Sequence, residues 1–566
     1  MAVEFDVRSV VIVGLFAALL GCGTAEQPAD LVLMGGRIVT MDGARPEAEA
    51  LAARGATIVA LGSEADINKL VGRDTEIVDL EGGLAVPGLI EGHGHFLGLG
   101  RARMQLDLTT AETWDEIVDM VREAAADTPD GQWIIGRGWH QEKWRTPPEG
   151  AVSGLPLHDA LSEATPSNPV MLTHVSGHAV FVNARAMAMA GIDATTPDPP
   201  GGQIVRGDGG RPIGVLRENA EELVTGLVES GRDEATLRRA AQLAGEACLA
   251  NGITSFHDAG TSMARVELLR SLAASHALPV RLWVMLSDSN EDLADRLSGY
   301  RVYREGEAFL TVGGIKRLYD GALGAHGALL LEPYDDLPES TGLNTVTADD
   351  LRATAELAAR FDLQLCTHAI GDRANRETLD VYEDVLAGLP DGRDRRWRVE
   401  HAQHLHPVDI PRFSQLGVIA AMQPIHCTSD GPWVPLRLGT ERAEHGAYVW
   451  RTLLDSGATI ASGTDTPVEA VDPIANFHAA VTRRMADGAA FYPEQAMTRI
   501  EALRAATIDA AYAAFEEDIK GSLAIGKLAD ITVLSQDILL VPEDEIPATR
   551  VLYTIVDGEV RYRGRS

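Results

Sequence analysis

The residues of this chain that could do chemistry begin with two histidines, His93 and His95, in the segment 87–95 (PGLIEGHGH). On an extended backbone the side chains of residues i and i+2 share a face, so both imidazoles can reach one metal ion. A glycine-rich loop that happens to carry two histidines explains the pair equally well. The choice between a metal site and a simple loop depends on which other residues lie beside the two histidines.

Four further residues could join this pair. His368 and His401 each follow an apolar run, where a lone histidine is more simply a core or surface residue. Asp465 could cap a helix, but beside a metal a carboxylate can both bind the ion and carry a proton. Lys316 would need a pKa well below ~10.4 to lie near a cation. A neutral amine can capture carbon dioxide and become a carbamate that bridges two metals; the alternative is an ordinary lysine paired with Asp320.

The elements that must position these residues are short apolar strands separated by helical stretches, the alternation typical of a parallel sheet. Eight strands are predicted, at 84–90, 252–256, 280–286, 313–318, 363–367, 397–399, 418–422 and 459–462. Eight such units predict a (β/α)8 barrel in which the candidate residues, near the strand ends, open on one face. The gap 97–251 is too long for one crossover, and we expect it to form a cap above the barrel mouth.

Both ends of the chain alternate short apolar runs with turns, which is typical of antiparallel strands. We therefore expect an α/β protein in which one β-sandwich, built from both chain ends, flanks the barrel. The predicted division is a signal peptide (1–21), a tether (22–30), the first part of the sandwich (31–86), the barrel domain (87–505, with the insertion 97–251) and the second part of the sandwich (506–566).

The first residues resemble an export signal. An apolar run at 10–20, too short to span a bilayer as a helix, ends in Leu19-Leu20-Gly21-Cys22, which resembles a bacterial lipobox. The segment before the run is poorly basic. We expect an exported protein, a cell-envelope lipoprotein or a periplasmic one, that meets the membrane only through a lipid on Cys22; a plain secretory signal is the alternative.

Composition excludes several classes of protein. The chain has 566 residues, 45% hydrophobic and 23% charged, which excludes disorder over the whole chain. Lys and Arg total 49 against 83 for Asp and Glu, a net charge of −34 that would repel nucleic acid. Four scattered cysteines make neither a disulfide framework nor a C-x-x-C zinc site.

The order His-x-His, Lys, His, His, Asp on successive strand ends, between the halves of a β-sandwich, resembles the amidohydrolase superfamily. Finer motifs are similar to its family-3, YtcJ-like branch, which contains N-substituted formamide deformylase. These motifs are GGIK (313–316) leading to DGALG (320–324), THAIGDRA (367–374), VEHAQ (399–403), MQPIH (422–426) and the closing KGSLAIGKLAD (520–530). The resemblance runs from about residue 30 to the end. Family members often follow the glycine of the DGALG segment with Ser-Arg, whereas this chain has Ala325-His326.

The resemblance implies a metal site made of His93, His95, His368 and His401, with Lys316 as a carboxylated ligand and Asp465 as both ligand and catalytic proton shuttle. It implies one or two divalent ions, and the nitrogen-rich ligand set favours zinc. Substrate-binding candidates are His178 and Asn183 in the insertion, for which a structural loop is the alternative, and His426 and Asp430 after the seventh strand.

The expected activity is hydrolysis of a non-peptide C–N bond in a small-molecule substrate, such as an amide, N-formyl, carbamate or cyclic amide bond. Metal-activated water attacks, and Asp465 moves the proton. The alternatives are a deaminase or esterase with the same groups, or a lipoprotein that binds without turnover. A homodimer is left open.

Overall fold

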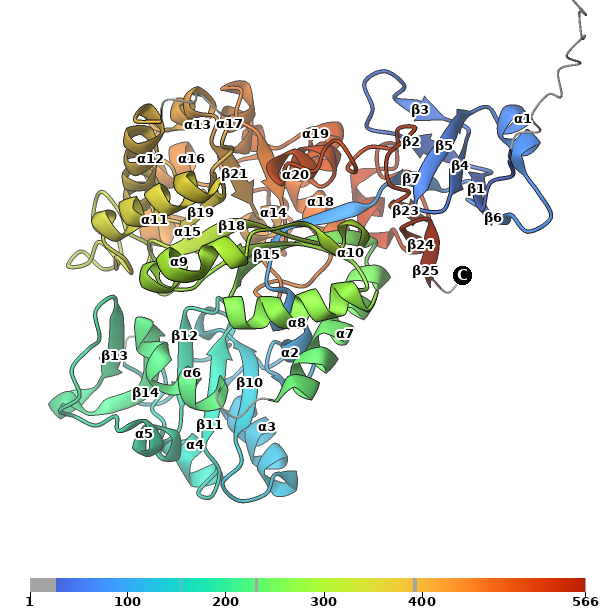
Figure 1. The fold of residues 1–566 in the computed structure, drawn as a ribbon. Helices are drawn as coiled ribbons and strands as arrows, with labels where there is room; N and C mark the ends of the chain where they lie inside the picture. The colour runs from blue at the N-terminus through green and yellow to red at the C-terminus, as the bar shows by residue number, and fades with distance from the viewer. Residues whose placement is uncertain (1–26, 153, 230–232, 390–393, 565–566) are drawn as a thin grey trace, which may run out of the picture.

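The computed structural model describes residues 27–152, 154–229, 233–389 and 394–564 (Figure 1). The predicted signal peptide and the lipid attachment site at Cys22 lie outside the described residues. Within the described ranges, no helix is both long enough and apolar enough to cross a membrane.

A barrel of eight parallel strands forms the centre of the molecule, as the sequence predicts. In sheet order from the last strand to the first, these are β22 (Ile460–Ser462), β21 (Ile419–Met422), β20 (Arg398–His401), β19 (Gln364–Ala369), β18 (Leu310–Leu318), β16 (Arg281–Leu286), β15 (Ile253–Thr261) and β8 (Leu89–Gly94). A short strand, β17 (Val302–Arg304), pairs with β18 outside this ring.

Backbone hydrogen bonds join the two ends of this sheet. The amide of Asp465 donates to the carbonyl of His93 (2.8 Å), and the amide of His95 donates to the carbonyl of Thr466 (2.7 Å). The segment after the last strand therefore lies against the end of the first strand. Residues almost four hundred positions apart in the chain meet at this seam.

The predicted first strand, 84–90, is two strands in two sheets. Residues Leu84–Pro87 form β7, which belongs to a terminal sheet, and the barrel strand β8 begins at Leu89. Proline lacks an amide hydrogen and glycine lacks a side chain, so the Pro87-Gly88 pair suits a change of sheet. The apolar run is continuous because residues 84–90 are buried throughout.

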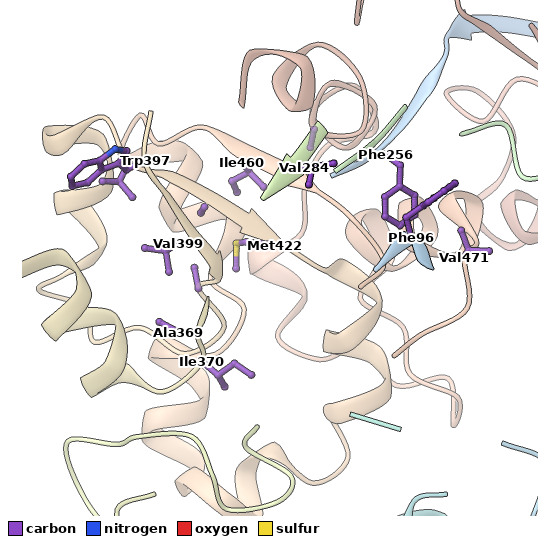
Figure 2. Close-up of a cluster of buried hydrophobic side chains, with 14 of the residues drawn as sticks. Phe96, Phe256, Val284, Ala369, Ile370, Trp397, Val399, Met422, Ile460 and Val471 are labelled. Atoms are coloured by element: carbon purple, nitrogen blue, oxygen red, sulfur yellow. The ribbon is translucent and has the colours of Figure 1, made fainter. Parts of the chain in front are cut away.

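Helices cover the barrel, and a close-packed core lies beneath them (Figure 2). Phe96 and Phe256 meet edge to face with ring centroids 5.4 Å apart, and Met422 and Ile460 belong to the same buried cluster. The helices are α8 (Met263–Ala274), α9 (Asn290–Arg296), α10 (Glu305–Ala308), α11 (Ala348–Phe361), α12 (Asp372–Ala387), α13 (Ile410–Leu416), α14 (Pro424–Asp430), α15 (Val434–Leu438), α16 (Thr440–Gly446), α17 (Trp450–Asp455), α18 (Pro473–Thr482), α19 (Arg499–Ala505) and α20 (Ile508–Ala513).

The insertion after the first barrel strand is a separate layer, seen below the barrel in Figure 1. Its sheet has the order β13 (Gly202–Arg206), β14 (Pro212–Glu218), β12 (Ala179–Val182), β11 (Val170–His174), β10 (Ile134–Trp139) and β9 (Leu106–Asp107). Helices α3 (Trp114–Asp127) and α4 (Asp159–Ala164) share one apolar cluster with the sheet, and α5 (Ala184–Ala190) and α6 (Glu222–Glu229) share another. We call this layer the cap.

The chain enters and leaves the cap through two helices in close contact, α2 (Phe96–Ala102) and α7 (Glu234–Ala250). A Cβ at Gly100 would lie 1.8 Å from the carbonyl oxygen of Ala240. Only glycine allows this approach.

Two further sheets flank the barrel; the first is built from the N-terminal part alone, and the second joins strands from both chain ends, as predicted. The first has the order β5 (Thr57–Gly62), β4 (Ala50–Arg54), β1 (Leu31–Met34) and β6 (Glu76–Asp79); the second has β25 (Glu559–Arg563), β24 (Val551–Val556), β23 (Ile531–Leu534), β7, β2 (Arg37–Val39) and β3 (Glu47–Ala48). Leu33 and Leu51 of the first sheet share a buried cluster with Ile531 and Ile555 of the second. Helix α20, in contrast, packs its alanines against barrel residues.

Candidate active site

Three buried side chains meet where the barrel strands end. His93 lies on β8, His401 ends β20, and Asp465 follows β22. Each offers one ligand atom, and these atoms all lie within 4.8 Å of one another. The distance from His93 Nε2 to Asp465 Oδ1 is 3.5 Å. Spacing and residue types match what a divalent metal ion requires of its ligands.

The remaining predicted ligands surround this group. His95 Nε2 lies 3.2 Å from Asp465 Oδ1, and the ring centroid of His368 lies 4.4 Å from that of His401. Lys316 is buried and lines one cavity with His95, His368, His401 and Asp465. The structure thus brings all six side chains to one rim of the barrel, although their assignment as ligands remains a prediction.

Unpartnered nitrogen atoms show that these residues fit a metal. Nε2 of His93 and Nε2 of His368 are buried and have no hydrogen-bond partner among the described residues. Such atoms are costly unless something binds them. Burial lowers the pKa of His93 to about 4, so its imidazole is neutral at pH 7, the state that binds metal.

The backbone at two of these residues lies in the left-handed region. His401 has φ 74° and Asp465 has φ 59°. L-residues other than glycine adopt this conformation at a cost, and it clusters at functional sites where the surrounding structure enforces it. Here it occurs at two of the three residues of the central group.

A buried carboxylate orients His93. Nδ1 of His93 hydrogen-bonds Oε2 of Glu400, which leaves Nε2 as the ligand atom. Arg398 donates to Glu400 twice, from Nε to Oε1 (2.7 Å) and from Nη2 to Oε2 (3.0 Å). Burial alone would raise the pKa of Glu400, but Arg398 and His93 hold it well below its ordinary value. Glu400 is therefore a carboxylate that keeps the His93 ring in position.

Two other polar residues hold the site in the same way. Gln423 Oε1 lies 2.7 Å from Nδ1 of His401, which fixes that ring. Glu91 accepts from the backbone amide of Thr464 (2.6 Å) and from its hydroxyl (2.8 Å), and so anchors the residue before Asp465. Burial raises the pKa of Glu91 to about 8.

Arg398 and Glu400 had no predicted role, although their positions in the sequence carry a signal. They occupy positions i and i+2 of a strand that is buried at every residue, so both side chains share one face. Opposite charges at alternating positions of a buried strand indicate an ion pair directed into the protein.

Three of the four predicted substrate-binding residues border the site. His178 lies on the cap, with Nδ1 2.8 Å from Glu218 Oε2 and its ring centroid 5.0 Å from that of His368. His426 Nε2 lies 3.4 Å from Asp465 Oδ2. Both His426 and Asp430 line a small cavity beside Asp465.

The structure corrects the prediction for Asn183. This side chain is fully buried inside the cap and caps helix α5 by accepting from the amide of Ala186 (2.9 Å). It also accepts from Val170 N (3.1 Å) and donates to the carbonyl of Asn168 (2.8 Å). These bonds satisfy its amide within the cap, so Asn183 supports the fold and does not face the substrate.

The alternative pairing of Lys316 with Asp320 is absent from the described residues. The Asp320 carboxylate accepts from three backbone amides instead, those of Leu329 (2.8 Å), Ile370 (2.9 Å) and Gly371 (2.8 Å). Burial lowers the pKa of Lys316. The lysine is thus closer to the neutral amine that carbamate formation requires.

Two cavities open beside Asp465 and His401. The larger, about 320 Å³, lies between barrel and cap and is lined by Arg137, His178 and Glu221 of the cap together with Lys316. The smaller, about 70 Å³, is lined by His426, Asp430 and Trp433 among others. A substrate centred on Asp465 therefore has room on both sides.

Buried histidines and an aspartate at one rim of a (β/α)8 barrel make the site of a metal-dependent hydrolase. Comparison with known protein families agrees. The profile of the amidohydrolase family matches residues 76–562, and the chain belongs to that family.

Curated relatives cover nearly the whole chain. Protein LONG AFTER FAR-RED 3 of Arabidopsis thaliana is 35% identical over 94% of this chain and 92% of its own length. The Bacillus subtilis protein YtcJ is 30% identical (93% and 98%), and the N-substituted formamide deformylase of Arthrobacter pascens is 28% identical (95% and 99%). The predicted resemblance to the YtcJ-like branch is confirmed.

A solved structure shows the same architecture. An uncharacterized metal-dependent hydrolase from Pyrococcus furiosus superposes with a TM-score of 0.70 at 26% identity, covering 90% of this chain and 99% of that one.

Proposed function

We propose that this hydrolase cleaves a non-peptide C–N bond, such as an amide, N-formyl, carbamate or cyclic amide bond, in a small-molecule substrate. The observation that carries the proposal is the convergence of His93, His401 and Asp465, with Nε2 of His93 left unpartnered in the interior. The likeness to the formamide deformylase of Arthrobacter pascens supports a nitrogen leaving group.

The metal would be held by His93, His95, His368, His401 and Asp465. We favour zinc because nitrogen ligands predominate, and a carboxylated Lys316 would add an oxygen ligand. A bound divalent ion supplies Lewis acidity, which lowers the pKa of water and polarises a carbonyl.

Asp465 would move the proton. Its carboxylate accepts a proton from the attacking water while the water oxygen bonds to the carbonyl carbon. When the C–N bond breaks, the nitrogen takes that proton and leaves as a neutral amine. Burial alone would raise the pKa of Asp465, but hydrogen bonds with His426 and His95 hold it well below its ordinary value, so the side chain is a carboxylate before the reaction.

The test combines elemental analysis with a hydrolysis panel of formamides, N-acyl amines, carbamates, esters and amino-heterocycles. We expect bound zinc, and we expect release of an amine from the formamides, N-acyl amines and carbamates. The Asp465→Asn variant should retain metal on its remaining histidines while losing about 10³-fold or more of the rate. Preferred turnover of esters or amino-heterocycles would indicate the esterase or deaminase instead. Ligand binding without turnover in the wild type would indicate a binding protein.

We also propose that the protein is exported, with residues 1–21 as signal peptide and residues 22–30 as tether. The lipobox-like segment ending at Cys22 supports a lipid anchor in the cell envelope. A homodimer is an open proposal that sedimentation of the purified protein would test.

A further inference from the structure

Basic side chains gather around the cavity between barrel and cap. Arg101, Arg137 and Arg265 line it together with Lys316. Glu221, Asp258 and Asp465 line the same cavity, so the partners of each arginine decide what it can bind. Among them, Arg137 has the most informative environment.

Arg137 is fixed by neutral acceptors from both layers. Its Nε donates to the carbonyl of Pro467 (3.2 Å), two residues after Asp465, and its Nη2 donates to the carbonyl of Val175 (2.8 Å) in the cap. Neither acceptor carries a charge. Within the part of the chain that the structure describes, Arg137 forms no ion pair, and Nη1 has no acceptor.

The nearest acids do not supply the missing counter-charge. Asp465 belongs to the proposed metal site, where a cation would compensate it. Burial raises the pKa of Glu221 well above its ordinary value, which favours its neutral form, and among the described residues no ion pair joins it to Arg137. Burial lowers the pKa of Arg137 to about 10, which still leaves it charged at pH 7. Arg137 is half-buried, and a cation withdrawn from water in this way is costly unless an anion pairs with it.

We propose that Arg137 binds a carboxylate on the substrate, so that the substrates of this enzyme are amides with a carboxylate on one arm. The guanidinium is already oriented by two hydrogen bonds and presents its remaining donors to the cavity, which suits carboxylate recognition. Because Arg137 is tied to the loop that carries Asp465, the carboxylate lies a few bonds from the scissile carbonyl. This inference rests on the proposed function.

The test compares acids with neutral isosteres in which a methyl ketone replaces the carboxylate. One series is N-formyl amino acids of increasing chain length, with the carboxylate on the amine arm. The other is N-propyl monoamides of dicarboxylic acids, with the carboxylate on the acyl arm. Amine release is measured for the wild type and for Arg137→Gln. The exposed cap variant Arg122→Gln, which removes the same charge far from the cavity, is the control.

We expect the wild type to prefer the acid of one series by roughly 10- to 100-fold in kcat/KM. Arg137→Gln should abolish the preference through KM while changing turnover of the isostere less than about threefold, and Arg137→Lys should restore part of it. The series that shows the preference identifies the arm. Equal turnover of acids and isosteres, or an equal loss for both in Arg137→Gln, would overturn the proposal.

A binding measurement separates this inference from the proposed function. Calorimetry of the same acids and isosteres with the wild type, Arg137→Gln and Arg122→Gln requires no turnover. Preferential binding of an acid that only Arg137→Gln loses supports the proposal, even where no compound of the panel is hydrolysed. Absence of any such preference in the folded wild type contradicts it, whatever the hydrolysis panel shows.

Discussion

Replacing Glu400 with glutamine should weaken metal binding and destabilise the protein by two separable routes. The carboxylate accepts from Nδ1 of His93 and twice from Arg398, and its side chain is fully buried. Glutamine has nearly the same shape but offers one acceptor oxygen and an amino group. Either Nδ1 of His93 or the Arg398 guanidinium must therefore face the amino group of the glutamine side chain, which is itself a donor.

The two effects have different sizes. Loss of the carboxylate that orients a metal-binding histidine lowers metal affinity about 10- to 100-fold, which is ~1.4–2.7 kcal/mol. Arg398 is left as a buried charge without its partner, which lowers the free energy of unfolding by about 3–5 kcal/mol. Surface Glu234→Gln, which removes an exposed pair with Arg238, should change stability by less than about 0.5 kcal/mol.

Two assays and a double variant separate the routes. Urea unfolding of the metal-free protein reports stability, and competition with a chromophoric chelator reports metal affinity. In Arg398→Met/Glu400→Gln the lone buried charge is gone, so part of the stability should return while metal affinity stays low. Unchanged metal affinity in a folded Glu400→Gln protein would refute the role of Glu400. Recovery of both quantities in the double variant would refute the separation.

Three further predictions concern other regions. Asn183→Ala should lower the free energy of unfolding by about 2–3 kcal/mol through the lost cap and buried hydrogen bonds, with unchanged kcat/KM per folded molecule; a selective rise in KM would restore Asn183 to the substrate site. Arg451 and the helix cap lower the pKa of Glu501 to about 2, against ~4.3 when unfolded. Its stabilisation is thus present above pH ~4.3 and lost as the pH falls towards 2. Glu501→Gln should therefore be less stable than the wild type by about 1–2 kcal/mol at pH 6, and the gap should fall to about 0.4 kcal/mol at pH 2 in urea titrations; a constant gap would contradict the pKa shift. Cys22→Ser should move the protein from the detergent phase to the aqueous phase in a phase-partitioning assay, and an unchanged partition would exclude the lipid anchor.

The sequence predicted the barrel and the meeting of its functional residues because a closed parallel barrel is regular. The carboxyl ends of all eight strands lie at one rim, so a count of the strands was enough to predict that His93 and Asp465 meet. The run 84–90 was misread as one strand because burial gives β7 and β8 the same apolar pattern.

The sequence did not predict which side chains of the cap face the barrel. Its sheet is covered on both faces, so alternation along β10 or β12 does not tell which side chains face the barrel. Asn183 follows an apolar strand just as His368 does, yet its strand ends inside the cap. Arg137 lies on another cap strand, and only the packing of cap against barrel places it beside Pro467.

The contact between Gly100 and Ala240 has a consequence for how this scaffold can diversify. Since α2 and α7 touch where the chain enters and leaves the cap, everything between the two helices is a module joined to the barrel through one narrow neck. An exchange of the cap at that neck would leave the strand that carries His93 intact and would replace the contact of Arg137 with Pro467. The resulting chimaeras would keep their bond-breaking apparatus and inherit a new preference for the molecules admitted to it.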